Sequence, residues 1–285
     1  MKILILGTGY VAQAFERYLW KEGINYQVLS RSSVDYTEGE ILKEFINSWK
    51  VDLVINSAGF TGKPNVDSCQ IYKTECLIGN VILAQTVAEA CKQTGTILGH
   101  VSSGCIFTGC KGEKGFTEND EPNFTFKQNN CSFYSGSKAL SEDIIKLYPQ
   151  NYILRLRMPF EHRANLRNYL TKVISYHTLL DATNSLTNID DFARVSIEIF
   201  NKGLPFGTYN ITNPGSITTR EITEMMKEKG LKKEFNFFES EDEFNKTVAA
   251  PRSNCVLDSS KVLSYGIKFE DVKKSVERCL DRWVV

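Results

Sequence analysis

Short apolar runs alternate with segments of helical periodicity along the first 156 residues. The apolar runs predict strands over residues 2–7, 26–30, 52–56, 96–101 and 152–156. Between them, apolar residues recur every three or four positions, which predicts helices over 11–19, 41–49, 77–88 and 134–148. Strands that alternate with helices pair in parallel through right-handed crossovers. The pattern therefore predicts an α/β protein with a doubly wound parallel sheet, the Rossmann architecture.

The regular alternation stops near residue 160. Helical periodicity returns near 166–177, 190–201, 218–229 and 270–283, with short strand candidates at 208–211 and 234–238. Ligands of open α/β sheets bind beyond the carboxyl ends of the strands. We therefore expect a dinucleotide-binding Rossmann domain over residues 1–160. Residues 161–285 are expected to form a smaller α/β substrate-binding lobe, with some segments returning to the first domain.

The composition indicates a sizeable core and no net charge. Hydrophobic residues make up 42% of the 285 residues, and 34 Lys and Arg balance 34 Asp and Glu. A net charge of zero provides no overall electrostatic attraction for nucleic acid or anionic lipid. No run approaches the roughly 18 apolar residues of a membrane span, and the run at residues 3–6 is too short for a signal peptide. We therefore expect a cytoplasmic protein that binds neither nucleic acid nor membrane.

Cysteine and histidine usage argues against a disulfide framework and a metal site. The eight cysteines include no CxxC pair, so reduced thiols are expected. None of the three histidines stands at metal-ligand spacing from another. We therefore expect no metal, and acid–base chemistry from other residue types.

A glycine-rich turn follows the first predicted strand and opens the first predicted helix. The sequence there is GxGxxA, in which glycines let the backbone approach a pyrophosphate and the alanine allows close packing. An ordinary tight turn is the alternative, but the position at the start of a βα unit favours a dinucleotide site. The expected contacts are Gly7, Thr8, Gly9, Tyr10 and Val11.

The end of the second predicted strand indicates which dinucleotide is bound. NAD sites carry an acidic residue there to bind the ribose 2′-hydroxyl, whereas this chain has Ser-Arg-Ser-Ser from residue 30 to 33. A guanidinium and hydroxyls suit a 2′-phosphate, so Arg31 favours NADP(H) over NAD(H). A solvated loop arginine is the alternative.

Tyr134 and Lys138 have the YxxxK spacing, which places both side chains on one helix face. A neighbouring ammonium favours phenolate and is expected to lower the pKa of Tyr134. The phenol can then donate a proton to a carbonyl as hydride arrives, and Lys138 can hold the nicotinamide ribose. Ser103, at the end of the fourth predicted strand, can hold the same carbonyl. YxxxK alone is common, but the ordered set of glycine turn, serine and YxxxK is specific.

These residues resemble the extended short-chain dehydrogenases/reductases. Further segments are similar to nucleotide-rhamnose synthase epimerase/reductases, and the similarity runs from the first strand beyond residue 258: VDLVINSAG at 51–59, TGKPNVD at 61–67, SGCIF at 103–107, RLRMP at 155–159, TNPG at 212–215 and APRSN at 250–254. One departure is the first turn, because extended relatives usually carry GxxGxxG there.

The resemblance implies conversion of UDP-4-keto-6-deoxy-D-glucose to UDP-β-L-rhamnose. C3 and C5 are inverted, and C4 is then reduced with NADPH. Cys105 and Lys172 would carry the epimerisation, with the acid and the base unassigned. Strand alternation would bring Cys105 to the same side as Ser103, and a nearby cation would lower the pKa of its thiol. A buried filler cysteine and a solvated helix lysine are the alternatives.

The resemblance also implies lesser contacts. Ala58 and Gly59 would line the cofactor cleft, and Met158 and Pro159 would contact the nicotinamide. Arg252, together with Ser103 and Cys105, would bind the sugar nucleotide, with a surface salt bridge as the alternative for Arg252.

Two rival functions remain at this point. One is a 4-keto reductase without epimerase activity that resembles dTDP-4-dehydrorhamnose reductase, although those enzymes typically have tyrosine at the position of Cys105. The other is a non-catalytic NADP-binding regulatory subunit, which has no need of an intact Ser103, Tyr134 and Lys138. The sequence leaves open whether the substrate carries UDP or dTDP, and whether the protein is a homodimer or a monomer.

Overall fold

Six parallel strands form the central sheet of the computed structural model, which describes residues 1–63 and 65–284. In space the strands follow the order β10-β5-β4-β3-β1-β2, and every neighbouring pair is parallel. Their bounds are β1 Lys2–Leu6, β2 Asn25–Leu29, β3 Leu53–Asn56, β4 Ile97–Ser103, β5 Asn151–Leu156 and β10 Gly207–Asn210. The predicted doubly wound Rossmann sheet is confirmed.

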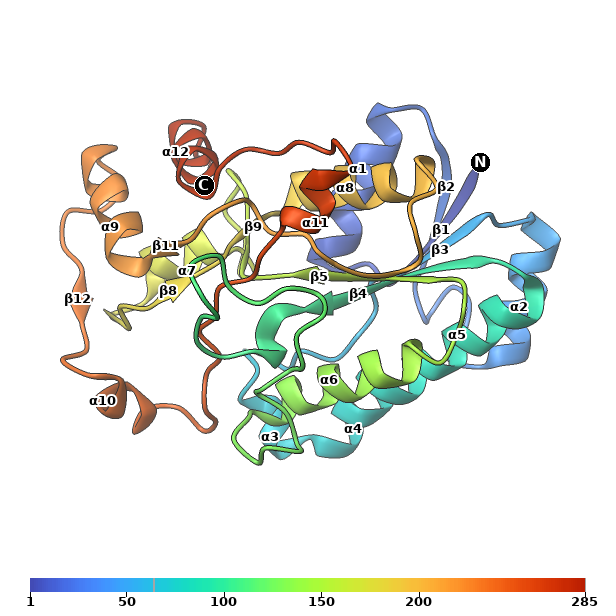
Figure 1. The fold of residues 1–285 in the computed structure, drawn as a ribbon, viewed down its shortest axis with the longest axis horizontal. Helices are drawn as coiled ribbons and strands as arrows, with labels where there is room; N and C mark the ends of the chain where they lie inside the picture. Colours follow the sequence, from blue (N-terminus) through green and yellow to red (C-terminus); the bar gives the residue numbers. More distant parts are fainter. Residues whose placement is uncertain (64, 285) are drawn as a thin grey trace.

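Helices cover both faces of this sheet. α1 (Tyr10–Lys21) and α8 (Ile189–Asn201) pack on one face; α2 (Gly39–Trp49), α5 (Leu83–Thr94) and α6 (Phe133–Ile145) lie on the other (Figure 1). Along β1, Ile3 and Ile5 join the core with α1 and α8, whereas Leu4 and Leu6 join the core with α2 and α5. Burial on both faces explains why the strand is apolar at every position.

The strand order reverses at β1, which has β2 on one side and β3 on the other. In open sheets the crevice at such a reversal binds ligands beyond the carboxyl ends of the strands. The glycine turn at residues 7–9 begins there, so the fold places the turn in the expected cofactor crevice.

The segment predicted as one helix over residues 77–88 is helical throughout, but its first part includes a π-helical turn. α3 (Ser68–Ile71) and α4 (Lys73–Leu77) precede a π-helical turn at Ile78–Ile82, and only then does α5 begin. A π turn inserts a residue into the helical repeat, and such turns are frequent at functional sites. The turn carries Asn80, whose side chain is 3% exposed.

The second lobe is built from short elements around a core that includes Phe160, Leu170, Met226 and Leu280. Its two-residue strands pair as β6–β9, β7–β12 and β8–β11. The bounds are β6 Pro159–Phe160, α7 Tyr169–Ser175, β7 Thr178–Leu179, β8 Thr183–Asn184, β9 Thr187–Asn188, β11 Ile217–Thr218, α9 Thr219–Glu228, β12 Asn236–Phe237, α10 Glu241–Asn245, α11 Ser260–Ser264 and α12 Val272–Asp281. From this half of the chain, α8 and β10 return to the sheet.

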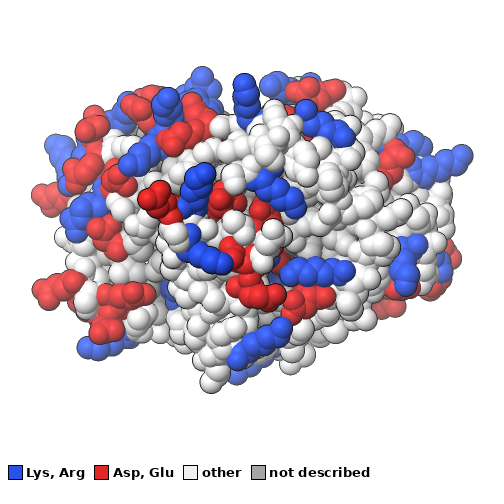
Figure 2. All heavy atoms as spheres, viewed as in Figure 1, with Lys and Arg blue, Asp and Glu red and all other residues white. Residues whose placement is uncertain are grey.

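The surface shows no dominant sign of charge. On the face in Figure 2, basic and acidic side chains are interspersed, and broad uncharged areas lie between them. Within residues 1–63 and 65–284, no helix has both the length and the apolar character needed to cross a bilayer.

Candidate active site

The glycine turn after β1 has no room for a side chain on Gly7. Gly7 has φ +94°, and a Cβ there would lie 3.1 Å from the backbone of Ala58. Its N–H donates to Leu29 O at 2.9 Å, which ties the turn to the end of β2. Gly9 caps α1 without a side-chain hydrogen bond, so the first N–H groups of this helix remain available to an anion. The turn therefore suits a pyrophosphate, despite its departure from GxxGxxG.

The loop after β2 presents a cation and clustered hydroxyls beside this turn. Ser30 Oγ lies 2.8 Å from Ser32 Oγ and 3.1 Å from Ser33 Oγ, and Arg31 is exposed. Because β1 and β2 pair to their ends, at Leu6 and Leu29, the loop and the glycine turn lie at the same edge of the sheet. The arrangement suits recognition of a ribose phosphate.

Asn80, which the sequence did not single out, holds the loop after β3. Its Oδ1 accepts from Phe60 N–H at 2.7 Å, and its Nδ2 donates to Phe60 O at 2.9 Å and to Ser137 Oγ at 3.0 Å. A Cβ on Gly59 would lie 2.9 Å from the same Oδ1. The loop that carries Ala58 and Gly59 is thus fixed between the glycine turn and α6.

Met158 lies in the bend between β5 and β6, immediately before Pro159. Its φ of +37° falls in the left-handed region that few residues other than glycine adopt. Strain of this kind concentrates at ligand sites, where the surrounding structure holds it. The predicted nicotinamide contacts are therefore placed on a strained bend at the carboxyl end of β5.

Ser103, Cys105, Tyr134 and Lys138 gather at the carboxyl end of β4. The strand ends at Ser103, and Cys105 lies in a 3₁₀ turn over Gly104–Ile106, where Ser103 Oγ accepts from Cys105 N–H at 3.2 Å. Tyr134 packs against the apolar cluster that contains Cys105. Lys138 Nζ donates to Val101 O at 3.0 Å. The expectation that strand alternation positions Cys105 was wrong, because a turn positions it.

The predicted direction of two pKa shifts was also wrong. Burial raises the pKa of Tyr134 well above its usual value, the neighbouring thiols raise it further, and Arg167 acts in the opposite direction. Burial also raises the pKa of Cys105, although Ser103, Arg157 and Lys138 oppose the rise. Desolvation outweighs the nearby cations in both cases. Both groups are therefore protonated at neutral pH and able to donate a proton.

Three cations form a group beside this centre: Arg167, Lys172 and Arg252. Arg252 Nη2 lies 2.6 Å from Asp67 Oδ2, and Arg167 Nη2 donates to Gly62 O at 2.8 Å. Burial lowers the pKa of Lys172, and the two guanidiniums lower it further. Within residues 1–63 and 65–284, no acidic side chain pairs with Lys172. Arg252 is thus in the salt bridge that the sequence analysis gave as its alternative, and a diphosphate would have to displace Asp67 to reach its guanidinium.

Arg167 lies close enough to both the cation group and the candidate centre for its charge to lower the pKa of Lys172 and of Tyr134. It lies in the loop between β6 and α7, outside every motif that the sequence offers. Only the folded arrangement identifies it.

A family model describing the RmlD substrate binding domain matches residues 1–285, the full sequence. The chain belongs to the RmlD substrate binding domain family.

Two relatives from Arabidopsis thaliana are each 35% identical to this RmlD-family chain. One is a bifunctional dTDP-4-dehydrorhamnose 3,5-epimerase/dTDP-4-dehydrorhamnose reductase, and the match covers 96% of this chain and 90% of the relative. The other is a trifunctional UDP-glucose 4,6-dehydratase/UDP-4-keto-6-deoxy-D-glucose 3,5-epimerase/UDP-4-keto-L-rhamnose-reductase. That match covers 97% of this chain but only 41% of the relative, so the chain spans less than half of the larger protein.

Solved structures show the same fold. The UDP-rhamnose synthase of Acanthamoeba polyphaga mimivirus superposes with a TM-score of 0.89 at 26% identity over 99% of each chain. A dTDP-4-dehydrorhamnose reductase from Bacillus anthracis, in complex with NADP, superposes with a TM-score of 0.81 at 19% identity, over 98% of this chain and 97% of that one.

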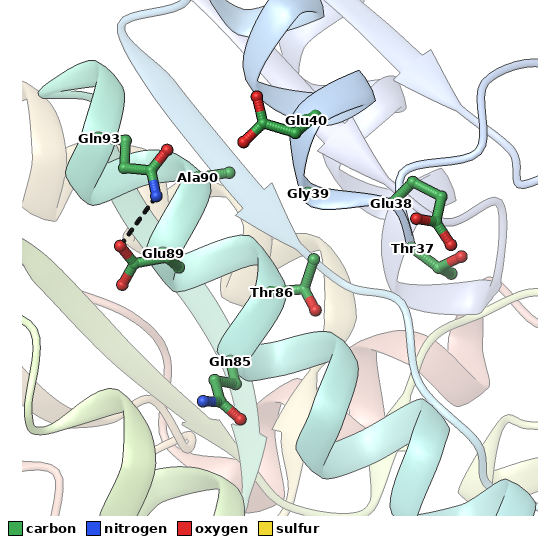
Figure 3. Close-up of a pocket in the computed structure, with 9 residues that line it drawn as sticks. All are labelled: Thr37, Glu38, Gly39, Glu40, Gln85, Thr86, Glu89, Ala90 and Gln93. Atoms are coloured by element: carbon green, nitrogen blue, oxygen red, sulfur yellow. Dashed lines mark hydrogen bonds between the residues drawn. The ribbon is translucent and has the colours of Figure 1, made fainter.

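One hollow of this RmlD-family chain lies away from the site. It measures about 400 Å³, and Figure 3 shows it between the start of α2 and one side of α5. Glu38, Glu40 and Glu89 line it, and Gln93 donates to Glu89 at 3.0 Å. Three carboxylates repel phosphates, so the hollow suits neither a dinucleotide nor a sugar nucleotide.

One cluster of metal-ligand type occurs within the described part of the chain. Donor atoms of Glu161, His162 and Asp190 lie within 4.8 Å of one another. Both carboxylates are already paired with guanidiniums: Arg17 lies 2.6 Å from Asp190, and Arg163 contacts Glu161 and Asp190. The cluster therefore carries no unbalanced negative charge for a cation.

Proposed function

We propose that the protein is a bifunctional 3,5-epimerase/4-reductase that converts UDP-4-keto-6-deoxy-D-glucose to UDP-β-L-rhamnose with NADPH. The observation that carries the proposal is the meeting of Cys105 with Ser103, Tyr134 and Lys138 at the end of one strand. The activities named for the two Arabidopsis thaliana relatives support it.

NADPH would bind along the glycine turn, with Arg31 and its neighbouring serines on the 2′-phosphate. Ala58 and Gly59 would line the cleft, and Met158 and Pro159 would contact the nicotinamide. When bound, the cofactor supplies the hydride for C4. Ser103 holds the C4 oxygen through its hydroxyl, and Tyr134, which burial keeps protonated, donates its proton to that oxygen. Lys138 holds the nicotinamide ribose.

Epimerisation depends on the C4 ketone, which acidifies the protons on C3 and C5. Burial and the neighbouring guanidiniums lower the pKa of Lys172, so it gives up its proton more readily than an exposed lysine and is suited to act as the base. Cys105 has a raised pKa and is suited to return a proton to the opposite face. The enolate formed between the two steps accepts hydrogen bonds from Ser103 and Tyr134. The directions of the two shifts thus favour Lys172 as the base and Cys105 as the acid.

The test is incubation with UDP-4-keto-6-deoxyglucose in deuterated water, with and without NADPH. We expect deuterium at C3 and C5 of the sugar by NMR, and UDP-rhamnose only when NADPH is present. Cys105→Ser keeps a side chain of similar size with a hydroxyl of much higher pKa, so it should bind NADPH normally and lose deuterium incorporation. Absence of deuterium at both carbons with the wild-type protein would remove the epimerase claim.

A reductase without epimerase activity is the second candidate. The raised pKa of Cys105 is equally compatible with this candidate, because a buried thiol that stays protonated can have a purely structural role. The two candidates separate on a sugar whose C3 and C5 are already inverted. A reductase alone would reduce that sugar and leave UDP-4-keto-6-deoxy-D-glucose without deuterium. Comparing kcat/KM for the UDP and dTDP forms then decides the nucleotide.

A further inference from the structure

Lys138 is buried against a histidine that no motif explains. The lysine is 6% exposed, and its Nζ lies 3.0 Å from Val101 O and 3.4 Å from His100 Nε2. Burial lowers the pKa of Lys138. An ammonium in this setting needs nearby acceptors to remain charged, because desolvation disfavours its protonated form.

His100 lies on β4 and is 1% exposed, with side chains facing both ring nitrogens. Ser141 Oγ, from α6, is 2.9 Å from Nε2. The amide of Asn56, at the end of β3, is 3.3 Å from Nδ1. All three side chains are at most 1% exposed, so the group is closed to bulk water.

The charge of this imidazole follows from its surroundings. Burial holds the pKa of His100 well below its usual range, and the ammonium of Lys138 lowers it further. The ring is therefore neutral at physiological pH and carries one proton. A proton on Nε2 would point an N–H at the ammonium, whereas a proton on Nδ1 leaves the Nε2 lone pair as an acceptor.

Asn56 can accommodate the second arrangement. Within the described residues, its Oδ1 has no hydrogen-bond partner. Rotating the amide by 180° exchanges oxygen and nitrogen without changing its shape. Oδ1 then faces Nδ1 of His100 and accepts its proton.

We propose that His100, neutral and protonated on Nδ1, is a positioning residue for Lys138 that offers it an uncharged acceptor. The inference rests on the reductase part of the proposed function. Val101 O accepts one N–H of Lys138 at 3.0 Å. The single lone pair of His100 Nε2, which the Ser141 hydroxyl also faces at 2.9 Å, is shared with a second N–H of Lys138 at 3.4 Å, and the third N–H is left for the nicotinamide ribose. An uncharged acceptor orients the ammonium without confining it in an ion pair.

The other ionisable groups that act on Lys138 are Cys105, Glu142 and Cys76. Glu142 is already engaged with Arg155 at 2.6 Å and with Ser102 at 2.6 Å. Burial keeps Cys105 protonated. Within the described residues, His100 is the side chain that lies within hydrogen-bond distance of Lys138 Nζ.

The experiment compares His100→Leu with His100→Gln. Leucine removes the acceptor, whereas glutamine can present an oxygen near the position of Nε2. We expect H100L to lower kcat for NADPH-dependent reduction about tenfold, the effect of losing one hydrogen bond to a charged group. KM for the keto sugar should change less than about threefold, because Lys138 does not bind the sugar.

The pH profile separates positioning from packing. Without its acceptor, the Lys138 ammonium loses its proton more readily, so the alkaline limb of kcat should move about one unit to lower pH in H100L. H100Q should retain the wild-type limb. His177→Leu, which changes an exposed histidine, is the control and should leave both kcat and the alkaline limb of the pH profile unchanged.

A second measurement does not depend on activity. Nitrogen-15 NMR of the histidine-labelled protein should show one imidazole that is neutral from pH 5 to pH 9 with its proton on Nδ1, and H100Q identifies that signal. The proposal would be overturned if a folded H100L kept the wild-type kcat and the wild-type alkaline limb of its pH profile. It would also be overturned if H100Q were as impaired as H100L, or if NMR placed the proton of His100 on Nε2. If the wild-type protein does not reduce the sugar, the proposed function fails and NMR still decides the state of His100.

Discussion

Replacing Glu142 with glutamine removes the charge that neutralises a buried guanidinium beneath α6. Glu142 lies one helical turn beyond Lys138, and its side chain and that of Arg155 are at most 1% exposed. The carboxylate accepts hydrogen bonds from Arg155 at 2.9 and 2.6 Å and from Ser102 at 2.6 Å. These contacts tie the helix that carries Tyr134 to β4 and β5.

We expect E142Q to destabilise the fold by about 3–5 kcal/mol, because removing one partner leaves an uncompensated buried charge. At roughly 2 °C per kcal/mol for a chain of this size, Tm falls by about 6–10 °C. The measurement is thermal melting at pH 7, followed by far-ultraviolet circular dichroism. E142M/R155M, which replaces both charges with apolar side chains, should recover most of the loss.

The matched control is E198Q. Arg194 and Glu198 approach to 2.6 Å, as Arg155 and Glu142 do, but their side chains are 29% and 30% exposed. Exposed pairs contribute about 0.2–1 kcal/mol, so Tm should fall by less than about 2 °C. Equal losses in E142Q and E198Q would refute the reasoning from burial.

The same pair predicts a response to acid. Burial alone would raise the pKa of Glu142. The charge and hydrogen bonds of Arg155 lower that pKa by more than burial raises it, so the net shift is downward. A carboxyl with a lower pKa in the folded state contributes stability above its unfolded pKa, about 4.3, and loses it as pH falls through the folded pKa. Below about pH 4.3, Tm should therefore fall more steeply in the wild type than in E142Q.

Further predictions concern the site. Deuterium exchange into the sugar should rise with pH through the lowered pKa of Lys172. K172R, which holds its proton, and K172M, which has no basic group, should both exchange at least about 100-fold more slowly and still bind the sugar nucleotide. R31Q should lower the preference for NADPH over NADH about tenfold in fluorescence titrations, and an unchanged preference would contradict the role of Arg31. A Cβ on Gly136 would meet the Phe126 ring at 2.2 Å, so G136A should cost about 1–3 kcal/mol in thermal melting, and F126A/G136A should cost less than the sum of the two single variants.

The parts of the site that the sequence predicted are those that one local segment determines. The glycine turn depends on Gly7 and the strand and helix on either side of it. The YxxxK pair depends only on the rise of one helix, since Tyr134 and Lys138 both lie on α6. In each case the geometry is complete within about twenty residues, so periodicity and residue type were sufficient.

Other parts depend on contacts between distant segments. Asn80 reaches Phe60 and Ser137 only because a π turn carries it to the loop after β3. Arg167 acts on Tyr134 across the boundary between the lobes. The pKa of Cys105 follows from burial, which a sequence pattern does not measure. Sequence reasoning therefore named residues that the fold brings together at the end of β4, and it misjudged the direction of the pKa shifts of Tyr134 and Cys105.

The route of the chain governs how the protein can be made. β10 borders β5 and α8 covers the sheet, yet both are synthesised after α7 and the first strands of the second lobe. When only residues 1–160 have emerged from the ribosome, β5 is an unpaired edge strand of the sheet. Such an edge can pair with other chains and cause aggregation. The six-stranded sheet can be completed only once Asn210 has emerged. α9 and α12, which complete the core of the second lobe, follow Asn210 in the chain, so the six-stranded sheet can close while that lobe is still unfinished.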